Sequence, residues 1–411
     1  MNVKVLSSSL TGTVSAVPSK SYAHRLLIAA ALSGGEISFG PSDDALRTAR
    51  GLTEMGFEAT FTGDSVRYGA FRPSDERREI HVGESGSTLR FLLPLAAALG
   101  VQATFVTEGR LGERPIDALS GALRAHGAET DGKEVSGRLT AGRYEIDATV
   151  SSQYVTGLLM ALPLLNGDSE IVLKGRMVSA PYVDITLEVL AKAGVEVIRT
   201  EAGFFVRGGQ TYKLRDRNVP GDFSGAAFYL VAGALGEGVT VTGIDTSSAQ
   251  GDKEVLDVIR RAGATVIEDG DCVTVKGGAL RAFTVDLGAI PDLAPILSVL
   301  AAYAEGESVF TKVGRLRDKE SDRLLAIRTM LSAAGIETKE EGDAMLIRGG
   351  KPKGGGFDSY RDHRMCMSAA VLAAFAEGDS LINDMDCVKK SYPAFWEDFT
   401  RVGGKYEVER G

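Results

Sequence analysis

The sequence predicts an α/β fold made of six copies of one unit, each with the order β-α-β-α-β-β. The first observation is a period: a helix-ending glycine recurs every 67 to 72 residues, at Gly56, Gly127, Gly194, Gly263, Gly335 and Gly403. Glycine is typical of this position because a helix usually ends in a left-handed turn that penalises a side chain. The second observation is that an Ala- and Leu-rich helix opens every copy. A fixed period of this kind indicates a repeat architecture.

The elements of a copy follow one another in a constant order. The opening segments are apolar nearly all round, which predicts buried helices, and they cover residues 24–35, 87–100, 151–167, 222–238, 291–306 and 362–378. A short strand follows, such as residues 170–175, and then a charged amphipathic helix that ends at the periodic glycine. Two short strands close most copies. One further strand, such as residues 78–83 or 283–288, leads into the next buried helix, and the last copy runs out at the C-terminus.

Composition limits the function. The 411 residues allow two or three domains. The irregular joint at Pro220–Gly221 favours two three-copy halves, and three pairs of copies stay open as an alternative. A net charge of −9 argues against a nucleic-acid partner, so an anionic ligand needs a local cluster of basic groups. Three sparse cysteines and four scattered histidines indicate no metal site and suit the cytoplasm. No apolar run is long enough to span a membrane.

Polar residues gather where the buried helices begin. Helix N-termini expose unpaired N–H groups and bind carboxylates and phosphates well. The four residues that we interpret first as helix caps are Ser19, Ser151, Asp222 and Asp292.

Four cations at helix starts are harder to explain structurally, because a positive charge opposes the helix dipole there. These are Lys20, Arg25, Arg90 and Arg364, and an anionic ligand would resolve the conflict. Residues 107–115 form a charged glycine-containing loop. Residues 314–323 are dense in both signs, and a salt-bridged surface explains them as well as a binding site does.

With these residues in place, the chain resembles the 5-enolpyruvylshikimate-3-phosphate synthase family over essentially its whole length. The segments that carry the resemblance are SKSYAHR at 19–25, GSTLR ending at Arg90, GRLGERP at 109–115, SSQ at 151–153, SAPYVDIT at 179–186, PDLAP at 291–295, KESDR at 319–323, DHRM at 362–365 and KKSYP at 389–393. The resemblance implies a two-domain inside-out α/β barrel with buried parallel helices. One lobe would be residues 20–218, the other residues 1–19 and 219–411, with the active site in the cleft.

The resemblance also implies a reaction. This family transfers the enolpyruvyl group of phosphoenolpyruvate to the 5-hydroxyl of shikimate 3-phosphate and releases phosphate through a tetrahedral intermediate. The step belongs to the shikimate pathway, which leads to chorismate and the aromatic amino acids, and it needs neither a metal nor an organic cofactor. The implied partners are these two small molecules, with no nucleic acid and no membrane, and the implied state is a monomer.

Site residues carry over by motif. The resemblance assigns Asp292 as the base for the 5-hydroxyl, Glu320 as the acid that protonates the methylene carbon, and Lys20 as a group that offsets developing charge. The residues implied for shikimate 3-phosphate are Lys20, Ser21, Arg25, Ser151, Ser152, Gln153, Ser179, Tyr182, Asp292, Arg315 and Lys319. Those implied for phosphoenolpyruvate are Lys20, Gly86, Arg90, Arg110, Gln153, Glu320, Arg323, Arg364 and Lys390.

Three positions depart from the pattern of well-known enteric members: Glu84 stands for Asn, Phe91 for Pro and Arg315 for Asn. A carboxylate at Glu84 would weaken the binding of anions. Two alternatives remain at this point. The sister enzyme that acts on UDP-N-acetylglucosamine shares the fold, but it carries a loop cysteine that residues 107–115 lack. A non-catalytic repeat that binds anions is the other.

Overall fold

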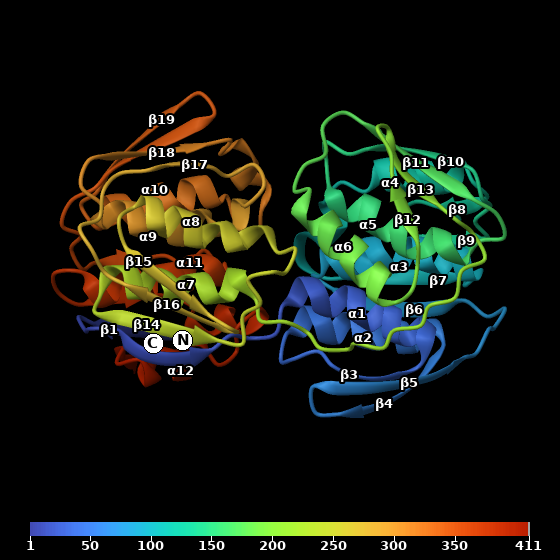
Figure 1. The fold of residues 1–411 in the computed structure, drawn as a ribbon, viewed down its shortest axis with the longest axis horizontal. Helices are drawn as coiled ribbons and strands as arrows, with labels where there is room; N and C mark the ends of the chain where they lie inside the picture. Colours follow the sequence, from blue (N-terminus) through green and yellow to red (C-terminus); the bar gives the residue numbers. More distant parts are fainter. Residues whose placement is uncertain (410–411) are drawn as a thin grey trace. The chain divides into compact units, whose positions relative to one another are not determined.

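The structure is a computed structural model that describes residues 1–409. The chain divides into two compact units, residues 18–219 and residues 1–17 with 220–411. We call them the middle unit and the terminal unit, and each contains three of the six copies (Figure 1).

The middle unit follows the predicted order copy by copy. Its first copy contains α1 (Lys20–Ser33), β3 (Gly35–Ser38), α2 (Asp43–Met55), β4 (Phe57–Thr62) and β5 (Ser65–Phe71). The second contains β6 (Arg78–Gly83), α3 (Gly86–Leu99), β7 (Ala103–Thr107), the 3-10 helix η1 (Gly109–Glu113), α4 (Asp117–Arg124), β8 (Ala128–Thr130) and β9 (Glu134–Gly137). The third contains β10 (Arg143–Asp147), α5 (Ser152–Ala161), η2 (Leu162–Leu164), β11 (Ser169–Lys174), α6 (Pro181–Lys192), β12 (Val197–Arg199) and β13 (Gly203–Val206).

The terminal unit repeats this order. Its copies contain α7 (Phe223–Leu235), β14 (Gly238–Thr242), η3 (Gly251–Lys253), α8 (Glu254–Arg261), β15 (Thr265–Asp269) and β16 (Cys272–Lys276). Then come β17 (Thr284–Asp286), η4 (Pro291–Leu293), α9 (Ala294–Tyr303), β18 (Glu307–Thr311), η5 (Gly314–Asp318), α10 (Arg323–Ala333), β19 (Glu337–Glu341) and β20 (Ala344–Arg348). The last copy has β21 (Gly356–Phe357), α11 (His363–Phe375), β22 (Ser380–Ile382), η6 (Met385–Lys390), α12 (Phe395–Arg401) and β23 (Lys405–Glu409).

Helices form the core of each unit and sheets form its walls. In the terminal unit α7, α9 and α11 pack against one another and are buried along nearly their whole length. In the middle unit α3 packs against α5, and β3, β4 and β5 lie outside α1 and α2 (Figure 1). The prediction of buried opening helices is confirmed.

The N-terminal strands belong to the terminal unit, which the repeat did not reveal. Strand β1 (Asn2–Leu6) lies between β22 and β23, so it supplies the strand that the last copy lacks at the C-terminus. Strand β2 (Thr11–Ser15) pairs in parallel with β14 and leads the copy that contains α7. The first copy of the middle unit consequently keeps a three-stranded sheet, β3-β5-β4.

Local signals fix the helix ends. All six periodic glycines have positive φ, as the prediction required: Gly56, Gly127, Gly194, Gly263, Gly335 and Gly403. Ser151 and Asp222 cap their helices through their side chains, as predicted. The cap interpretation is wrong for the other two residues: Ser19 stands at the N-cap position without a capping side-chain bond, and Asp292 lies inside η4.

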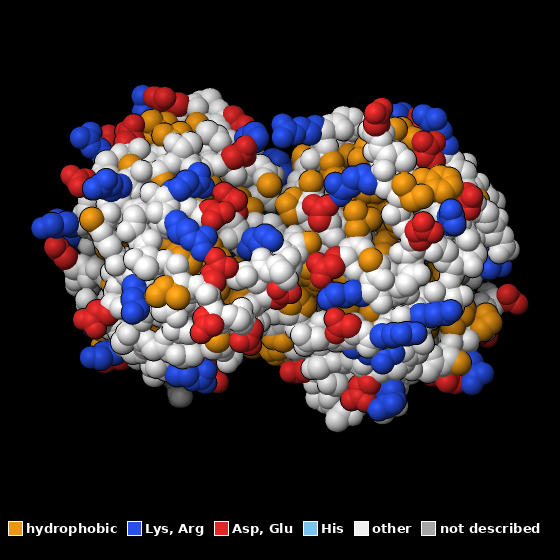
Figure 2. Space-filling view, viewed as in Figure 1, with side chains coloured by type: hydrophobic (Ala, Val, Ile, Leu, Met, Phe, Trp, Pro, Cys, Tyr) orange, Lys and Arg blue, Asp and Glu red, His pale blue; other side chains and the backbone are white. Residues whose placement is uncertain are grey.

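Surface charges are mixed. Figure 2 shows Lys and Arg interspersed with Asp and Glu over the visible face, as a net charge of −9 from 46 basic and 55 acidic residues suggests. Among residues 1–409, no helix has both the length and the apolar character to cross a membrane.

Candidate functional site

The predicted site residues of the terminal unit converge on Asp292. Its Oδ1 accepts hydrogen bonds from Lys319 Nζ at 3.2 Å and from Arg323 Nη1 at 2.8 Å, and its Oδ2 lies 3.3 Å from Arg364 Nη2. Asp292 is held in η4, directly before the buried helix α9. Residues from η4, the start of α10 and the start of α11 are therefore brought together around one carboxylate.

Arg323 is the centre of this cluster and is fully buried. Besides Asp292, it donates to Glu320 Oε2 at 2.8 Å and to Asp362 Oδ2 at 2.7 Å. A guanidinium suits this position because its rigid fork of donors can serve several carboxylates at once. The stretch 314–323 thus contains two environments: Arg323 is buried in the cluster, whereas the half-exposed Arg317 pairs with Glu340 on the surface.

Three cations and three carboxylates balance one another here: Lys319, Arg323 and Arg364 against Asp292, Glu320 and Asp362. Burial alone would raise the pKa of Asp292, but Arg364, Lys319 and Arg323 together hold that pKa well below its ordinary value. Burial likewise opposes ionisation of Glu320, but Arg323 chiefly holds its pKa low. Both carboxyls are therefore ionised without a ligand.

The remaining terminal-unit predictions lie near this cluster in the chain. Arg315, in η5, donates to the backbone oxygen of Gly288 at 3.4 Å. Lys390 ends η6, which packs against α11, the helix that carries Arg364.

Sequence reasoning missed two carboxylates. Asp362 caps α11 by accepting from the Arg364 N–H, and the same carboxylate accepts from Arg323 and from Ser321 Oγ. Asp252, in η3, is 5% exposed and accepts from the Ser224 hydroxyl. Burial and the neighbouring Asp292 raise the pKa of Asp252 to about 6. An Asp within the DHRM segment was a visible signal for Asp362, whereas nothing local distinguishes Asp252.

In the middle unit, Lys20 has a partner that was not predicted. Its ammonium lies 2.8 Å from Asp44 Oδ2, and Asp44 is the second residue of α2. The side chains of Lys20 and Asp44 are 25% and 12% exposed, so the pair is partly open to solvent. A protein carboxylate therefore already offsets the unfavourable charge at the start of α1.

Arg25 braces two predicted substrate residues. It is 2% exposed, and its guanidinium donates to the backbone oxygens of Ser21 at 2.6 Å and Tyr182 at 2.8 Å and to Thr186 Oγ1 at 2.7 Å. Burial lowers its pKa to about 9. These hydrogen bonds tie α1 to α6.

Arg90 and Gln153 link α3 to α5. Arg90 Nη1 donates to Gln153 Oε1 at 2.6 Å and Nη2 donates to the Pro115 oxygen at 3.0 Å, while Gln153 Nε2 donates to Ser87 Oγ at 2.9 Å. Burial lowers the pKa of Arg90 to about 10. Gly86 opens α3, and a Cβ there would lie 2.8 Å from Arg90 Nη1. The backbone of Gly86 is thus pressed close to two basic side chains, Arg90 and Arg114.

The other predicted residues of this unit lie at its helix starts and in a loop. Ser152 and Ser179 are buried, and Ser179, two residues before α6, has a left-handed φ of 52°. Ser151 accepts from the Gln153 N–H at 3.2 Å. Arg110, in η1, is 79% exposed and contacts Glu113 of its own loop at 3.9 Å.

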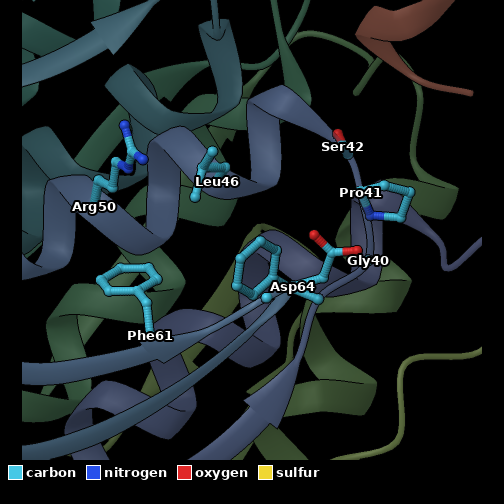
Figure 3. Close-up of a pocket in the computed structure, with 9 residues that line it drawn as sticks. Gly40, Pro41, Ser42, Leu46, Arg50, Phe61 and Asp64 are labelled. Carbon is cyan, nitrogen blue, oxygen red and sulfur yellow. The ribbon is translucent and has the colours of Figure 1, made fainter. Parts of the chain in front are cut away.

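One cavity of the middle unit lies away from all these residues. It has a volume of about 300 Å³ and lies between the start of α2 and the β4–β5 hairpin (Figure 3). Its lining comprises Phe39, Gly40, Pro41, Ser42, Leu46, Arg50, Phe61, Gly63 and Asp64. None of the predicted site residues lines it, so its shape says nothing about the predicted chemistry.

Comparison with solved structures defines the class of fold. The chain matches an EPSP synthase from Acinetobacter baumannii with a TM-score of 0.85 at 23% identity, covering 100% of both chains. It also matches the enolpyruvyl transferase NikO from Streptomyces tendae with a TM-score of 0.77 at 19% identity, over 99% of this chain and 98% of that one. These likenesses confirm the predicted two-domain inside-out α/β fold of the enolpyruvyl transferases.

Sequence comparison identifies the family. The family model for EPSP synthase (3-phosphoshikimate 1-carboxyvinyltransferase) matches residues 6–399. The 3-phosphoshikimate 1-carboxyvinyltransferases of Clostridium kluyveri and Clostridium novyi are 40% and 38% identical, each over 98% of both chains. The chain belongs to the EPSP synthase family, so the predicted family is confirmed.

Proposed function

We propose that this protein transfers the enolpyruvyl group of phosphoenolpyruvate to the 5-hydroxyl of shikimate 3-phosphate and releases phosphate. Membership of the EPSP synthase family supports this transferase activity and its place in the shikimate pathway of aromatic amino-acid biosynthesis. The same finding disfavours UDP-N-acetylglucosamine as the acceptor. The observation that carries the proposal is the Asp292 carboxylate held by Lys319, Arg323 and Arg364.

The chemistry needs one base and one acid. In the addition step Asp292 takes the proton of the 5-hydroxyl, whose oxygen bonds to C2 of phosphoenolpyruvate, while Glu320 gives a proton to C3. In the elimination step the Glu320 carboxylate takes a proton back from C3, the C2–C3 double bond re-forms, the C2–O bond to phosphate breaks, and the leaving phosphate takes the proton held by Asp292. Lys319 and Arg364, both within 3.3 Å of Asp292, offset the negative charge that develops.

Protonation of Glu320 requires the ligand. Arg323 holds this carboxyl ionised in the free protein, so it cannot act as an acid at neutral pH. Phosphoenolpyruvate brings a carboxylate and a phosphate that compete for the same guanidinium groups. Sharing Arg323 with the ligand weakens its hold on Glu320 and raises the pKa of that carboxyl toward the working range.

The middle unit supplies further binding groups in this proposal. Lys20 and Gln153 contact both substrates, Gly86 and Arg110 contact phosphoenolpyruvate, and the residues that bind shikimate 3-phosphate are Ser21, Ser151, Ser152, Ser179 and Tyr182. Arg25 and Arg90 act by positioning, since their guanidinium groups donate to the protein. We still predict that the protein is a monomer and that it is located in the cytoplasm, and sedimentation tests the oligomeric state.

Phosphate release from phosphoenolpyruvate tests the function directly. We expect release with shikimate 3-phosphate and none with UDP-N-acetylglucosamine, and the opposite result would overturn the assignment. Asp292→Asn and Glu320→Gln should lower kcat by roughly 100-fold or more. The exposed Asp286, paired with Lys312 on the surface, provides the control Asp286→Asn, which should keep full activity. Anion binding without phosphate release would instead favour a non-catalytic repeat.

A further inference from the structure

Four buried polar side chains of the middle unit form one continuous set of hydrogen bonds across three helices. His24 Nδ1 in α1 lies 2.6 Å from Thr48 Oγ1 in α2, and Thr48 Oγ1 lies 2.7 Å from Thr88 Oγ1 in α3. Thr88 Oγ1 in turn lies 2.8 Å from Ser85 Oγ, at the N-cap position of α3. All four residues are at most 2% exposed. We call His24, Thr48, Thr88 and Ser85 the polar network.

The polar network is connected to the start of each of these three helices. Two of its hydroxyls lie 3.5 and 3.4 Å from the backbone oxygen of Asp44, the second residue of α2. The Asp44 carboxylate pairs with Lys20, the first residue of α1. The network ends at Ser85, and the next residue, Gly86, is the first of α3. The network thus links Lys20 and Gly86, which both contact phosphoenolpyruvate in the proposed function.

The histidine sets the direction of the hydrogen bonds. Burial lowers the pKa of His24 to about 3, so its ring is neutral and has one N–H. Nε2 is buried and has no hydrogen-bond partner within residues 1–409. A buried donor without an acceptor is rarer than an acceptor without a donor, so the hydrogen belongs on Nδ1. His24 therefore donates to Thr48. The short contacts then have Thr48 donate to Thr88, and Thr88 donate to Ser85.

Packing alone does not require these hydroxyls. Val has nearly the shape of Thr, and replacing hydrogen-bonded groups by apolar groups of the same shape can be nearly neutral for stability. A buried polar network whose groups are satisfied makes the core rigid and specifies one arrangement of the elements that it joins. The arrangement that is specified here is the spacing of the starts of α1, α2 and α3.

We propose that His24, Thr48 and Thr88 are positioning residues for phosphoenolpyruvate. Through the polar network they hold the first turn of α3 against the starts of α1 and α2, so the binding groups at these starts keep a fixed spacing. None of the three has to touch the ligand. The effect on phosphoenolpyruvate rests on the proposed function, whereas the hydrogen bonds and their direction do not.

The first experiment tests the direction of the network without any activity assay. Nitrogen-15 NMR of the free protein should show the His24 ring neutral at pH 7, with its hydrogen on Nδ1 and slow to exchange with solvent, because the whole network is buried. The signal is assigned by its loss in His24→Asn. A hydrogen on Nε2, or a ring that titrates near the ordinary pKa of about 6.5, would overturn the network as described.

The second experiment measures positioning with Thr88→Val. This variant removes a hydroxyl from the middle of the network, and the Thr48 hydroxyl keeps the Asp44 oxygen as an acceptor. In the phosphate-release assay, kcat/KM for phosphoenolpyruvate should fall by roughly tenfold or more, because small displacements of binding groups are costly. The loss should come mainly from a higher KM, and KM for shikimate 3-phosphate should change by less than about twofold. Thr88→Ser, which keeps the hydroxyl, should restore most of the lost kcat/KM.

Thr53→Val is the matched control. Thr53 lies in the same helix as Thr48, and its hydroxyl donates to the Ala49 oxygen of that helix at 3.2 Å, so this variant should keep full activity. Thermal unfolding of each variant shows whether the fold is intact. Unchanged kinetics of Thr88→Val, equal increases in both KM values, or no recovery in Thr88→Ser would refute the positioning role. A native protein that releases no phosphate would refute the proposed function and leave the NMR result standing.

Discussion

Replacing Arg323 by Met removes the central charge of the Asp292 cluster while roughly keeping its volume. Arg323 is fully buried and donates to three carboxylates, Asp292, Glu320 and Asp362. Removing one partner from a buried ion-pair network leaves uncompensated charge and costs about 3–5 kcal/mol. In a unit of about this size, that loss lowers the unfolding midpoint by about 6–20 °C.

Arg317→Met is the matched control for this variant. Arg317 also pairs with two carboxylates, Asp322 and Glu340, but its side chain is 44% exposed. An exposed pair is worth about 0–1 kcal/mol, so this variant should change stability little. Both proteins would be followed by urea and thermal unfolding, with circular dichroism reporting the terminal unit's transition.

The pH dependence separates charge from packing. The pKa values of Asp292, Glu320 and Asp362 are lower in the folded protein than their ordinary values of 3.8, 4.5 and 3.8. Their contribution to stability is therefore complete above those values and is lost as pH falls through the folded pKa values. The deficit of Arg323→Met should be complete above about pH 6 and should shrink below about pH 4. Equal losses in both variants, or a deficit that does not change with pH, would refute this reasoning.

Three further outcomes follow from single residues. Asp252 has a pKa of about 6 in the folded protein, so its contribution to stability is present below about pH 4 and is lost as pH rises through 6. In urea unfolding, Asp252→Asn should therefore raise the free energy of unfolding by about 3 kcal/mol at neutral pH and leave it unchanged near pH 4. A Cβ on Gly157 would lie 2.2 Å from the Arg90 oxygen, so Gly157→Ala should cost about 1–3 kcal/mol by thermal unfolding, while Gly121→Ala, in open helix surface, should not destabilise. Glu84→Gln should lower KM for phosphoenolpyruvate by roughly twofold to tenfold in the phosphate-release assay, and an unchanged KM contradicts this.

Local periodicity in the sequence predicted most of the fold. The period of the glycines and the apolar helices marked six copies because each copy repeats the same local pattern. The pairing of β1 with β22 and β23 was not predictable in this way, since it joins residues at opposite ends of the chain. An incomplete last copy was the visible signal, and a strand edge without a partner is a reason to look for one elsewhere in the sequence.

The candidate site also has residues that a local pattern predicts and residues that only the tertiary structure brings in. The cations Lys20, Arg90 and Arg364 could be selected from the sequence because their charge opposes a helix dipole. Their carboxylate and amide partners Asp44 and Gln153 come from other helices, so no local rule pairs them. Asp292 shows most clearly where local rules fail. An Asp before a buried helix usually caps it, but the Asp292 carboxylate instead pairs with cations from η5–α10 and α11.

These pairings change how an anion can be bound by an acidic protein. A bare cluster of cations would repel itself in the free state and would attract any anion. Pairing the cations with carboxylates avoids both the repulsion and the unselective binding of anions. Here Lys319, Arg323 and Arg364 are balanced by Asp292, Glu320 and Asp362. A ligand must then outcompete these internal partners, which only a polyanion with fork-matching oxygens does well. The carboxylates released by that exchange are the proposed base and acid, so binding of the substrate and preparation of the proton-transfer groups are one electrostatic event.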